Sequence, residues 1–182
     1  MCEGGSGDEE LLTVRLRLVR PSAADVPTIL ALHRDPLACA HNPSDMLADP
    51  DEAAERQRGW DGHWRRHGFG YWSVRWGDAD PGDAPIGFCG LKVMRLHGGE
   101  VLNLFYRLDP AVWGGGVASE AAAAVVGWAA ARAPGRPVVA RVRAANVASA
   151  RVARRVGLRR APQLDAEGED GLDEVYCSPW PA

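Results

Sequence analysis

The chain has 182 residues, with 21 Lys plus Arg against 24 Asp plus Glu and a formal net charge of -3. Hydrophobic residues make up 46% and charged residues 25%, a mixture typical of one globular domain and not of a disordered or collagen-like chain. Its apolar stretches are shorter than the ~20 residues that a membrane-spanning helix needs. The nearly neutral charge balance argues against a general nucleic-acid binder.

Basic residues are distributed unevenly along the chain. Lys92 is the only lysine, so every other basic residue is an arginine, and nine of the arginines lie between Arg132 and Arg160. Such a cluster is typical of a solvated helix face or of a phosphate-binding site. Arg suits the second use because one guanidinium can bind two phosphate oxygens at once. RNA binding is an alternative interpretation of the same charges.

The cysteines and the N-terminus indicate the compartment. The chain has four cysteines, Cys2, Cys39, Cys89 and Cys177. They form no C-x-x-C pair, and a chain of this length does not need disulfides. Residues 1–10 contain neither a basic nor an apolar segment, so they do not resemble a signal peptide. We expect a cytoplasmic protein with a disordered tail over residues 1–10 and one domain over residues 11–182.

The first part of the chain predicts helices followed by antiparallel strands. Apolar residues alternate from Leu12 to Leu18, which indicates a half-buried strand. Ser22 and Asp25 are spaced as in a capping box, and Asp49 before Pro50 favours a second helix start. The expected elements are a strand over 12–18, helices over 26–33 and 50–64, and strands over 70–76, 86–93 and 101–108.

After residue 108 the pattern changes to alternating helices and strands. An Ala-rich segment follows a glycine run, and Pro134-Gly135 ends it. The expected elements are helices over 119–133 and 146–156 and strands over 138–142, 158–161 and 173–177, with an acidic loop over 165–171. No internal repeat or long linker divides the chain.

The glycine run is the most informative local feature. Gly114-Gly115-Gly116 lies between a predicted strand and a predicted helix. Glycines let backbone N–H groups turn toward one point, and a helix N-terminus adds further N–H donors and partial positive charge. The segment therefore favours a phosphate site, to which the Ser119 hydroxyl could contribute. It matches neither a Walker loop nor G-x-G-x-x-G, and a glycine turn without a ligand is the alternative.

A second polar pair lies at the next strand-to-helix junction. Asn146 is placed to cap the helix, and Ser149 follows on the same side. The alternatives are a cap with a surface hydroxyl, or a pair that faces the ligand bound at the glycine run.

Together these elements resemble the GNAT superfamily of acetyl-CoA-dependent N-acetyltransferases. The branch that includes the ribosomal-protein N-terminal acetyltransferases has Trp-Gly-x-Gly-x-Ala-Ser/Thr-Glu-Ala, which the residues from Trp113 to Ala121 match at every fixed position. Asn146, Ser149 and Gly157-Leu158 match its Asn-x-x-Ser and Gly-Phe, with Leu in place of Phe. The resemblance covers roughly residues 12–177.

The resemblance implies a fold and a cosubstrate. The implied fold is a single α/β (α+β) GNAT-like domain, with a mixed, mostly antiparallel sheet of about six to seven strands and about four helices. Acetyl-CoA would enter where the central strands splay apart, and no metal is implied. The acceptor would be a small-molecule or peptide amine, with no membrane or nucleic-acid partner, and relatives often form homodimers.

The resemblance also implies roles for residues of this sequence. Ser149 would protonate the departing thiolate, and Asn146 would bond the pantetheine. One or two arginines of the last third, among them Arg154, would contact a phosphate. The pantetheine would pair with the strand residues Phe105, Tyr106, Arg107 and Leu108. The pyrophosphate would lie on the N–H groups of Trp113, Gly114, Gly115, Gly116, Val117, Ala118 and Ser119.

The general base is the point at which the sequence departs from this branch. Many relatives have a carboxylate where this chain has Asn103. Glu100 and His97 lie at the head of the same strand and are candidates for the base, or are solvated turn residues. Glu120 is expected to complement the dipole of the helix that follows the glycines.

Other residues have a structural and a functional interpretation. His63 and His67 are four apart on a predicted helix, which allows a metal site but is also typical of a surface pair. Cys89 is expected to be a buried thiol. Six aromatic residues could line an acceptor pocket or pack in the core: Trp60, Trp64, Tyr71, Trp72, Phe88 and Tyr106.

We expect direct acetyl transfer to a primary amine, without an acyl-enzyme, since neither a Ser/His/Asp nor a reactive Cys motif is present. The alternatives are a CoA-binding module with little or no transferase activity, and an RNA-binding protein. Because the arginines gather on the predicted cofactor side, the carboxylates elsewhere leave room for a cationic acceptor.

Overall fold

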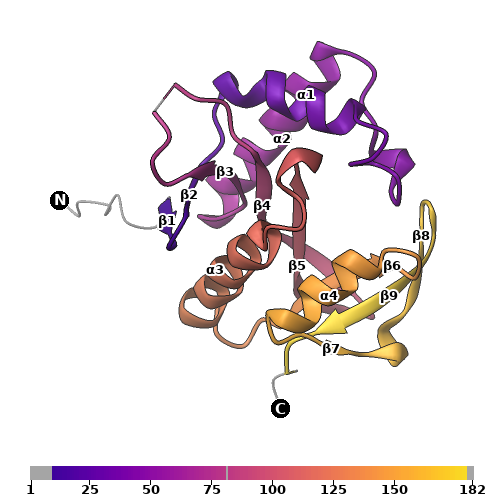
Figure 1. Ribbon diagram of the computed structural model, residues 1–182. Coiled ribbons are helices and arrows are strands. Elements are labelled where there is room, and N and C mark those ends of the chain that lie inside the picture. The colour runs from indigo at the N-terminus through magenta and orange to yellow at the C-terminus, as the bar shows by residue number, and fades with distance from the viewer. Residues whose placement is uncertain (1–9, 81, 180–182) are drawn as a thin grey trace.

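The computed structural model describes residues 10–80 and 82–179, which form one sheet with helices on both sides (Figure 1). The α-helices are α1 (Val26–Arg34), α2 (Pro50–His67), α3 (Val117–Arg132) and α4 (Val147–Arg155). The strands are β1 (Glu10–Leu12), β2 (Leu16–Val19), β3 (Tyr71–Trp76), β4 (Gly87–Leu96), β5 (Gly99–Leu108), β6 (Val138–Arg143), β7 (Arg159–Arg160), β8 (Ala166–Gly168) and β9 (Gly171–Cys177). Short 3-10 turns are η1 (Ala23–Asp25), η2 (Pro43–Asp45), η3 (Pro110–Val112) and η4 (Pro162–Leu164).

The strands follow the order β1-β2-β3-β4-β5-β6-β9-β7, with β8 paired to β9. Every pairing is antiparallel except the one between β5 and β6. The predicted antiparallel meander is therefore confirmed, and it extends from β2 through β5. The change to alternating helices and strands after β5 is confirmed as well, and it produces the single parallel crossover through α3.

Local signals set most element boundaries. Ser22 and Asp25 form the predicted capping box ahead of α1. At the start of α2 the Asp49 side chain accepts a hydrogen bond from the Glu52 N–H, with Pro50 in the first turn. Gly68 ends α2 with φ +76°, a left-handed conformation that favours glycine.

Two segments differ from the prediction. The strand expected over 12–18 is two strands, β1 and β2, because the Thr13 N–H and hydroxyl both bond the Leu16 carbonyl and turn the chain. The expected acidic loop over 165–171 contains β8, which forms a hairpin with β9. The tail predicted over residues 1–10 falls on residues 1–9, which lie outside the described residues, while Glu10 begins β1.

Apolar side chains form a core on each face of the sheet. The larger core packs α3 and α4 against the sheet and includes Trp72, Leu102, Leu104, Val125 and Ala153. A second core lies under α1 and the first part of α2 and includes Ile29, Leu32, Trp60 and Phe88. Because side chains alternate along a strand, β5 contributes to both cores, with Leu104 and Tyr106 on one face and Phe105 on the other.

The sheet opens between β5 and β6. These strands pair only at Leu102 with Val138 and at Asn103 with Val139. Beyond those residues β5 continues with β4 as far as Leu108, while β6 continues with β9 as far as Arg143. The later halves of the two strands therefore diverge, and Figure 1 shows α4 on the far side of this opening from β4. Among the helices of residues 10–80 and 82–179, none combines the length and apolar character of a membrane span.

Candidate active site

The glycine run forms a tight turn between β5 and α3. Gly114 and Gly116 have φ of +80° and +78°, and Gly116 is the N-cap of α3. The Trp113 indole N–H donates to the Leu108 carbonyl over 3.0 Å, which fixes the turn to the end of β5. The free N–H groups of the first turn of α3 therefore follow directly on the strand that borders the opening. This geometry fits the anion site that the sequence predicts.

An arginine from the other end of the chain reaches the same turn. The Arg15 guanidinium donates to the Gly115 carbonyl over 3.0 Å and to Glu120 over 2.7 Å. Glu120 also accepts hydrogen bonds from the Thr13 hydroxyl and the Arg15 N–H. Sequence reasoning missed this contact, since no local pattern links residue 15 to residue 115. It places a partly exposed cation beside the glycine turn.

Glu120 therefore does more than complement the dipole of α3. Burial raises the pKa of its carboxyl, but hydrogen bonds from Thr13 and Arg15 outweigh burial and hold the pKa below its ordinary value. The ionised carboxylate connects the β1–β2 turn to the first turn of α3.

A hydroxyl pair bridges the opening in the sheet. The Tyr106 hydroxyl on β5 lies 2.5 Å from the Ser149 hydroxyl on α4 and 3.1 Å from the Ser149 carbonyl. Asn146 caps α4, and its side-chain oxygen accepts from the Ser149 N–H over 3.0 Å. The structure thus brings three predicted site residues together and adds the direct contact between Tyr106 and Ser149.

The protonation state of this pair follows from its surroundings. Burial raises the pKa of Tyr106 to about 12, although the bond to Ser149 opposes the shift. The phenol therefore keeps its proton at neutral pH. Two linked hydroxyls can donate a proton to a group that develops negative charge in the opening.

The structure does not bring Glu100 and His97 to this pair. Glu100 is the second residue of β5 and precedes Tyr106 by six residues, which separates the two by roughly 20 Å along the strand. Its side chain is 51% exposed and forms an ion pair with Arg136 at 3.3 Å. His97 is a turn residue of the β4–β5 hairpin, with φ 47°. Neither residue contacts the hydroxyl pair.

Arg154 faces β9. Its guanidinium donates to the Tyr176 hydroxyl over 3.2 Å and stacks on the Tyr176 ring. Arg151 and Arg155 are exposed on the same helix.

A cavity of about 240 Å³ lies on the opposite face of β5 from Tyr106. It is lined by Asp45, Arg56, Trp60, Tyr71, Lys92 and Phe105. The rings of Tyr71 and Phe105 stack with their centroids 4.7 Å apart, and Trp60 meets Tyr71 edge-on at 5.3 Å. Of the predicted aromatic candidates, Trp60 and Tyr71 line this cavity, whereas Trp64, Trp72 and Phe88 are buried in the cores.

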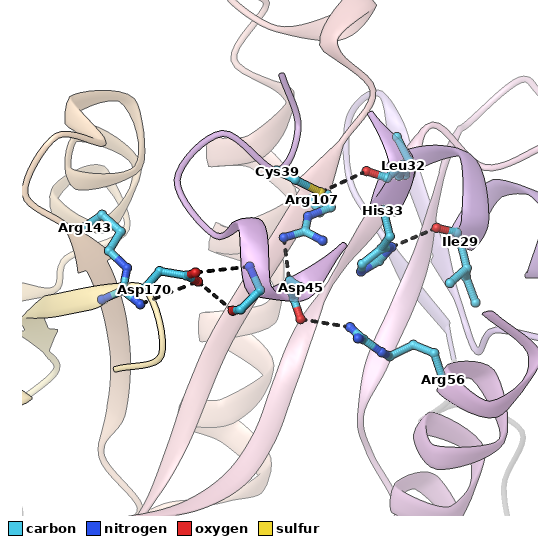
Figure 2. A network of polar contacts seen from close by, with 10 residues as sticks. Ile29, Leu32, His33, Cys39, Asp45, Arg56, Arg107, Arg143 and Asp170 are labelled. Carbon is cyan, nitrogen blue, oxygen red and sulfur yellow. Dashed lines mark hydrogen bonds and ion pairs between the residues drawn. The ribbon is translucent and has the colours of Figure 1, made fainter. Parts of the chain in front are cut away.

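The carboxylate in this cavity is held by two arginines. Asp45 binds Arg56 and Arg107, each over 3.0 Å, as Figure 2 shows. Burial raises the pKa of Asp45, but the two guanidinium groups outweigh burial and keep the pKa below its ordinary value. Asp45 is therefore a poor proton acceptor. The same surroundings keep His33 neutral, since burial and the charge of Arg107 lower its pKa to about 4.

The loop between α1 and α2 reaches across to the β8–β9 hairpin. The Ser44 hydroxyl and N–H both donate to Asp170, over 2.6 and 3.1 Å. Figure 2 shows Arg143 of β6 next to Asp170. Arg143 also pairs with Asp173 over 2.9 Å. This contact joins two segments of the chain at one edge of the opening.

His63 lies where α2 contacts the sheet, and His67 is the last residue of α2. The His63 Nε2 accepts from the Val93 N–H, and its Nδ1 donates to the Phe69 carbonyl. Within the described ranges, no three His, Cys, Asp or Glu side chains are grouped as metal ligands. Cys89 is fully buried, and burial raises the pKa of its thiol.

Comparison with known proteins identifies the family. The chain matches the family described as Acetyltransferase (GNAT) domain over residues 15–159. It belongs to the GNAT acetyltransferase family. The predicted resemblance and the predicted mixed α/β fold are confirmed, and the protein is an acyltransferase of this family.

Solved structures share the fold of this acetyltransferase. An acetyltransferase from Agrobacterium tumefaciens str. C58 is 26% identical, with a TM-score of 0.77 over 93% of this chain and 94% of that chain. A GnaT-family acetyltransferase from Bordetella pertussis is 22% identical, with a TM-score of 0.77 over 93% of this chain and 99% of that chain. RimL, a ribosomal L7/L12 alpha-N-protein acetyltransferase solved with coenzyme A, is 19% identical, with a TM-score of 0.71 over 94% and 98%.

Proposed function

We propose that the protein transfers the acetyl group of acetyl-CoA directly to a primary amine of a small molecule or a peptide N-terminus. The observation that carries the proposal is the opening between β5 and β6, which has the glycine turn at one end and the Tyr106–Ser149 pair across it. RimL, a neighbour of the same fold, was solved with coenzyme A. The chain offers matching groups for both the phosphates and the thioester end.

The binding residues follow from the geometry of the opening. The N–H groups from Gly114 to Ser119 would hold the pyrophosphate, with Arg15 as an added cation beside the turn. The free edge of β5 from Phe105 to Leu108 would pair with the amides of the pantetheine, since β6 does not occupy that edge. Asn146, whose side-chain oxygen caps α4, would bond the pantetheine.

The chemistry of the step needs a proton donor at sulfur. The amine nitrogen forms the new amide bond as the carbon–sulfur bond breaks, and sulfur leaves as a thiolate. Ser149, hydrogen-bonded to Tyr106, would donate the proton that sulfur takes up. Both hydroxyls are at least partly buried, so the charge that develops on sulfur is stabilised more than it would be in water.

A positively charged acceptor cavity replaces a dedicated base. Arg56 and Lys92 line the cavity, and nearby cations favour the neutral form of an amine that binds there. The proton lost by the acceptor nitrogen would pass to water. We therefore do not assign Glu100 as the base.

A second candidate function is a CoA-binding module without turnover. Asn103 in place of a carboxylate, and the pairing of Asp45 with two arginines, favour this alternative. Thiol release from acetyl-CoA, measured with a panel of amino acids, amines and N-terminal peptides, distinguishes the two. Thiol release with at least one acceptor supports the transferase. CoA binding without thiol release for any acceptor supports the CoA-binding module. A chain that does not bind CoA would contradict both.

A further inference from the structure

The composition of the chain favours a cationic acceptor, which a negatively charged cavity would bind. The charges in the cavity have the opposite sign. Two cationic side chains, Arg56 and Lys92, line the cavity together with one carboxylate, Asp45. Arg107 binds that carboxylate as well. Both oxygens of Asp45 are already bound to arginines. Since the carboxylate is neutralised locally, the cavity carries net positive charge. The expectation of a cationic acceptor is therefore not supported by this surface.

Lys92, the only lysine of the chain, is the cation that remains available in the cavity. Its side chain is exposed on β4, and within the part of the chain that the structure describes no ion pair involves it. Arg56 lies across the cavity on α2 and uses one of its nitrogens to hold Asp45. Two cations on facing elements can bind one carboxylate from two sides.

The aromatic walls limit what else can bind. The Tyr71 ring contacts the rings of both Trp60 and Phe105, and the three form an apolar wall beside the cations. Such walls can also attract an organic cation. Here a further positive charge would meet Lys92 and Arg56 at short range, which opposes that use. The volume of about 240 Å³ suits a side chain or a small metabolite, not a large oligosaccharide.

The cavity is adjacent to the point at which the sheet opens. Lys92 is the register partner of Asn103, and Asn103 is the last β5 residue that pairs with β6. The Asn103 side-chain oxygen is buried and has no hydrogen-bond partner. Asn103 and Phe105 lie on the same face of β5 because strand side chains alternate. An amine N–H placed at Asn103 would satisfy that oxygen and would lie within reach of a carboxylate bound at Lys92.

We infer that the acceptor is an amine that carries a carboxylate close to it, as an α-amino acid does, with Lys92 and Arg56 binding the carboxylate and Asn103 accepting from the amine. The inference rests on the proposed acetyl transfer and names the acceptor class of that same site. It predicts discrimination against polyamines and other polycations. An apolar or aromatic side chain would pack against Trp60 and Phe105.

The test compares matched acceptors that differ in the carboxylate alone. L-Leucine and L-phenylalanine are compared with L-leucinamide and L-phenylalaninamide, and spermidine serves as the polycation. Thiol release gives kcat/KM, expressed per neutral amine because amidation lowers the pKa of the amine. We expect each acid to exceed its amide by about tenfold, the ratio that one charge-assisted contact supplies. Lys92→Gln should reduce this ratio toward one.

A second measurement does not depend on turnover. Calorimetry with the CoA-bound protein compares N-acetyl-L-leucine with N-acetyl-L-leucinamide, and the acid should bind about tenfold more tightly. Arg95→Gln is the control, since Arg95 is an exposed cation on the same strand and bonds Gly98 at the distant hairpin. Equal affinities, equal rates or a preference for spermidine would overturn the inference. Failure to bind CoA would instead contradict the proposed function.

Discussion

The Tyr106 hydroxyl lies 2.5 Å from the Ser149 hydroxyl and joins β5 to α4 across the opening of the sheet. If this pair protonates the leaving thiolate, its removal slows the chemical step and leaves the phosphate site intact. We expect Ser149→Ala to lower kcat by about 100-fold and Tyr106→Phe by about tenfold, within the range that a positioned proton donor contributes. Thiol release at saturating substrate measures kcat, and CoA titration measures affinity.

The CoA titration separates this role from a structural one. CoA affinity should stay within about threefold in both variants, since neither residue touches the glycine turn. An unchanged kcat in Ser149→Ala would remove the hydroxyl pair from the mechanism.

Gly116 tests the phosphate site. Its φ of +78° favours glycine, and an added Cβ would strain the turn by about 1–2 kcal/mol. Gly98, with φ +81° and no atom within 4 Å of an added Cβ, provides a matched strain at the distant β4–β5 hairpin. Gly116→Ala should weaken CoA binding at least tenfold, whereas Gly98→Ala should lose similar stability but keep its affinity. Equal affinities in the two variants would contradict a phosphate site at this turn.

The ion pair between Glu120 and Arg15 predicts a pH dependence of stability. The folded state lowers the pKa of Glu120, so its contribution is full above the unfolded pKa of about 4.3 and is lost as pH falls through the folded pKa. Glu120→Gln should therefore lower the free energy of unfolding by about 1 kcal/mol at pH 7, with the partly exposed Arg15 limiting the effect. Urea unfolding at pH 7 and pH 3 should show the difference between variant and wild type shrinking with acid. A difference that is constant with pH would contradict the assignment.

The buried pair between Asp25 and Arg75 is expected to support the fold and not the reaction. Asp25 is 2% exposed and binds Ser73 and Arg75, over 2.9 and 2.5 Å. Asp25→Asn leaves a buried arginine without its counter-charge, so we expect a loss of about 3–5 kcal/mol in urea unfolding. Asp61→Asn, which affects partly exposed pairs, should cost at most about 1 kcal/mol. Similar losses in the two variants would argue against a special role for the buried pair.

Glu100 is expected to be dispensable for catalysis. It lies roughly 20 Å along β5 from Tyr106 and pairs with Arg136 at the surface. Glu100→Gln should leave kcat and the pH–rate profile unchanged. A loss of the basic limb of that profile would show that a carboxylate base does act through this residue.

Local sequence signals were enough to predict most elements of the fold and the position of the glycine turn ahead of α3. Caps such as Asp49 and the left-handed glycines act within a few residues, so their effect can be predicted locally. The successive strands expected over 70–76, 86–93 and 101–108 predicted the antiparallel meander of β3, β4 and β5. The glycine turn and the Asn146 cap also lie where the sequence placed them.

Which side chains come together in a site depends on contacts between segments that are distant in the sequence. The contacts of Arg15 with Gly115, of Tyr106 with Ser149 and of Asp45 with Arg107 join residues from 43 to 100 positions apart. Contacts of this kind depend on sheet register and on how far β6 diverges from β5, and no local spacing records either. For the same reason, composition favoured a cationic acceptor, whereas the assembled cavity is positive and favours an acceptor that carries a carboxylate.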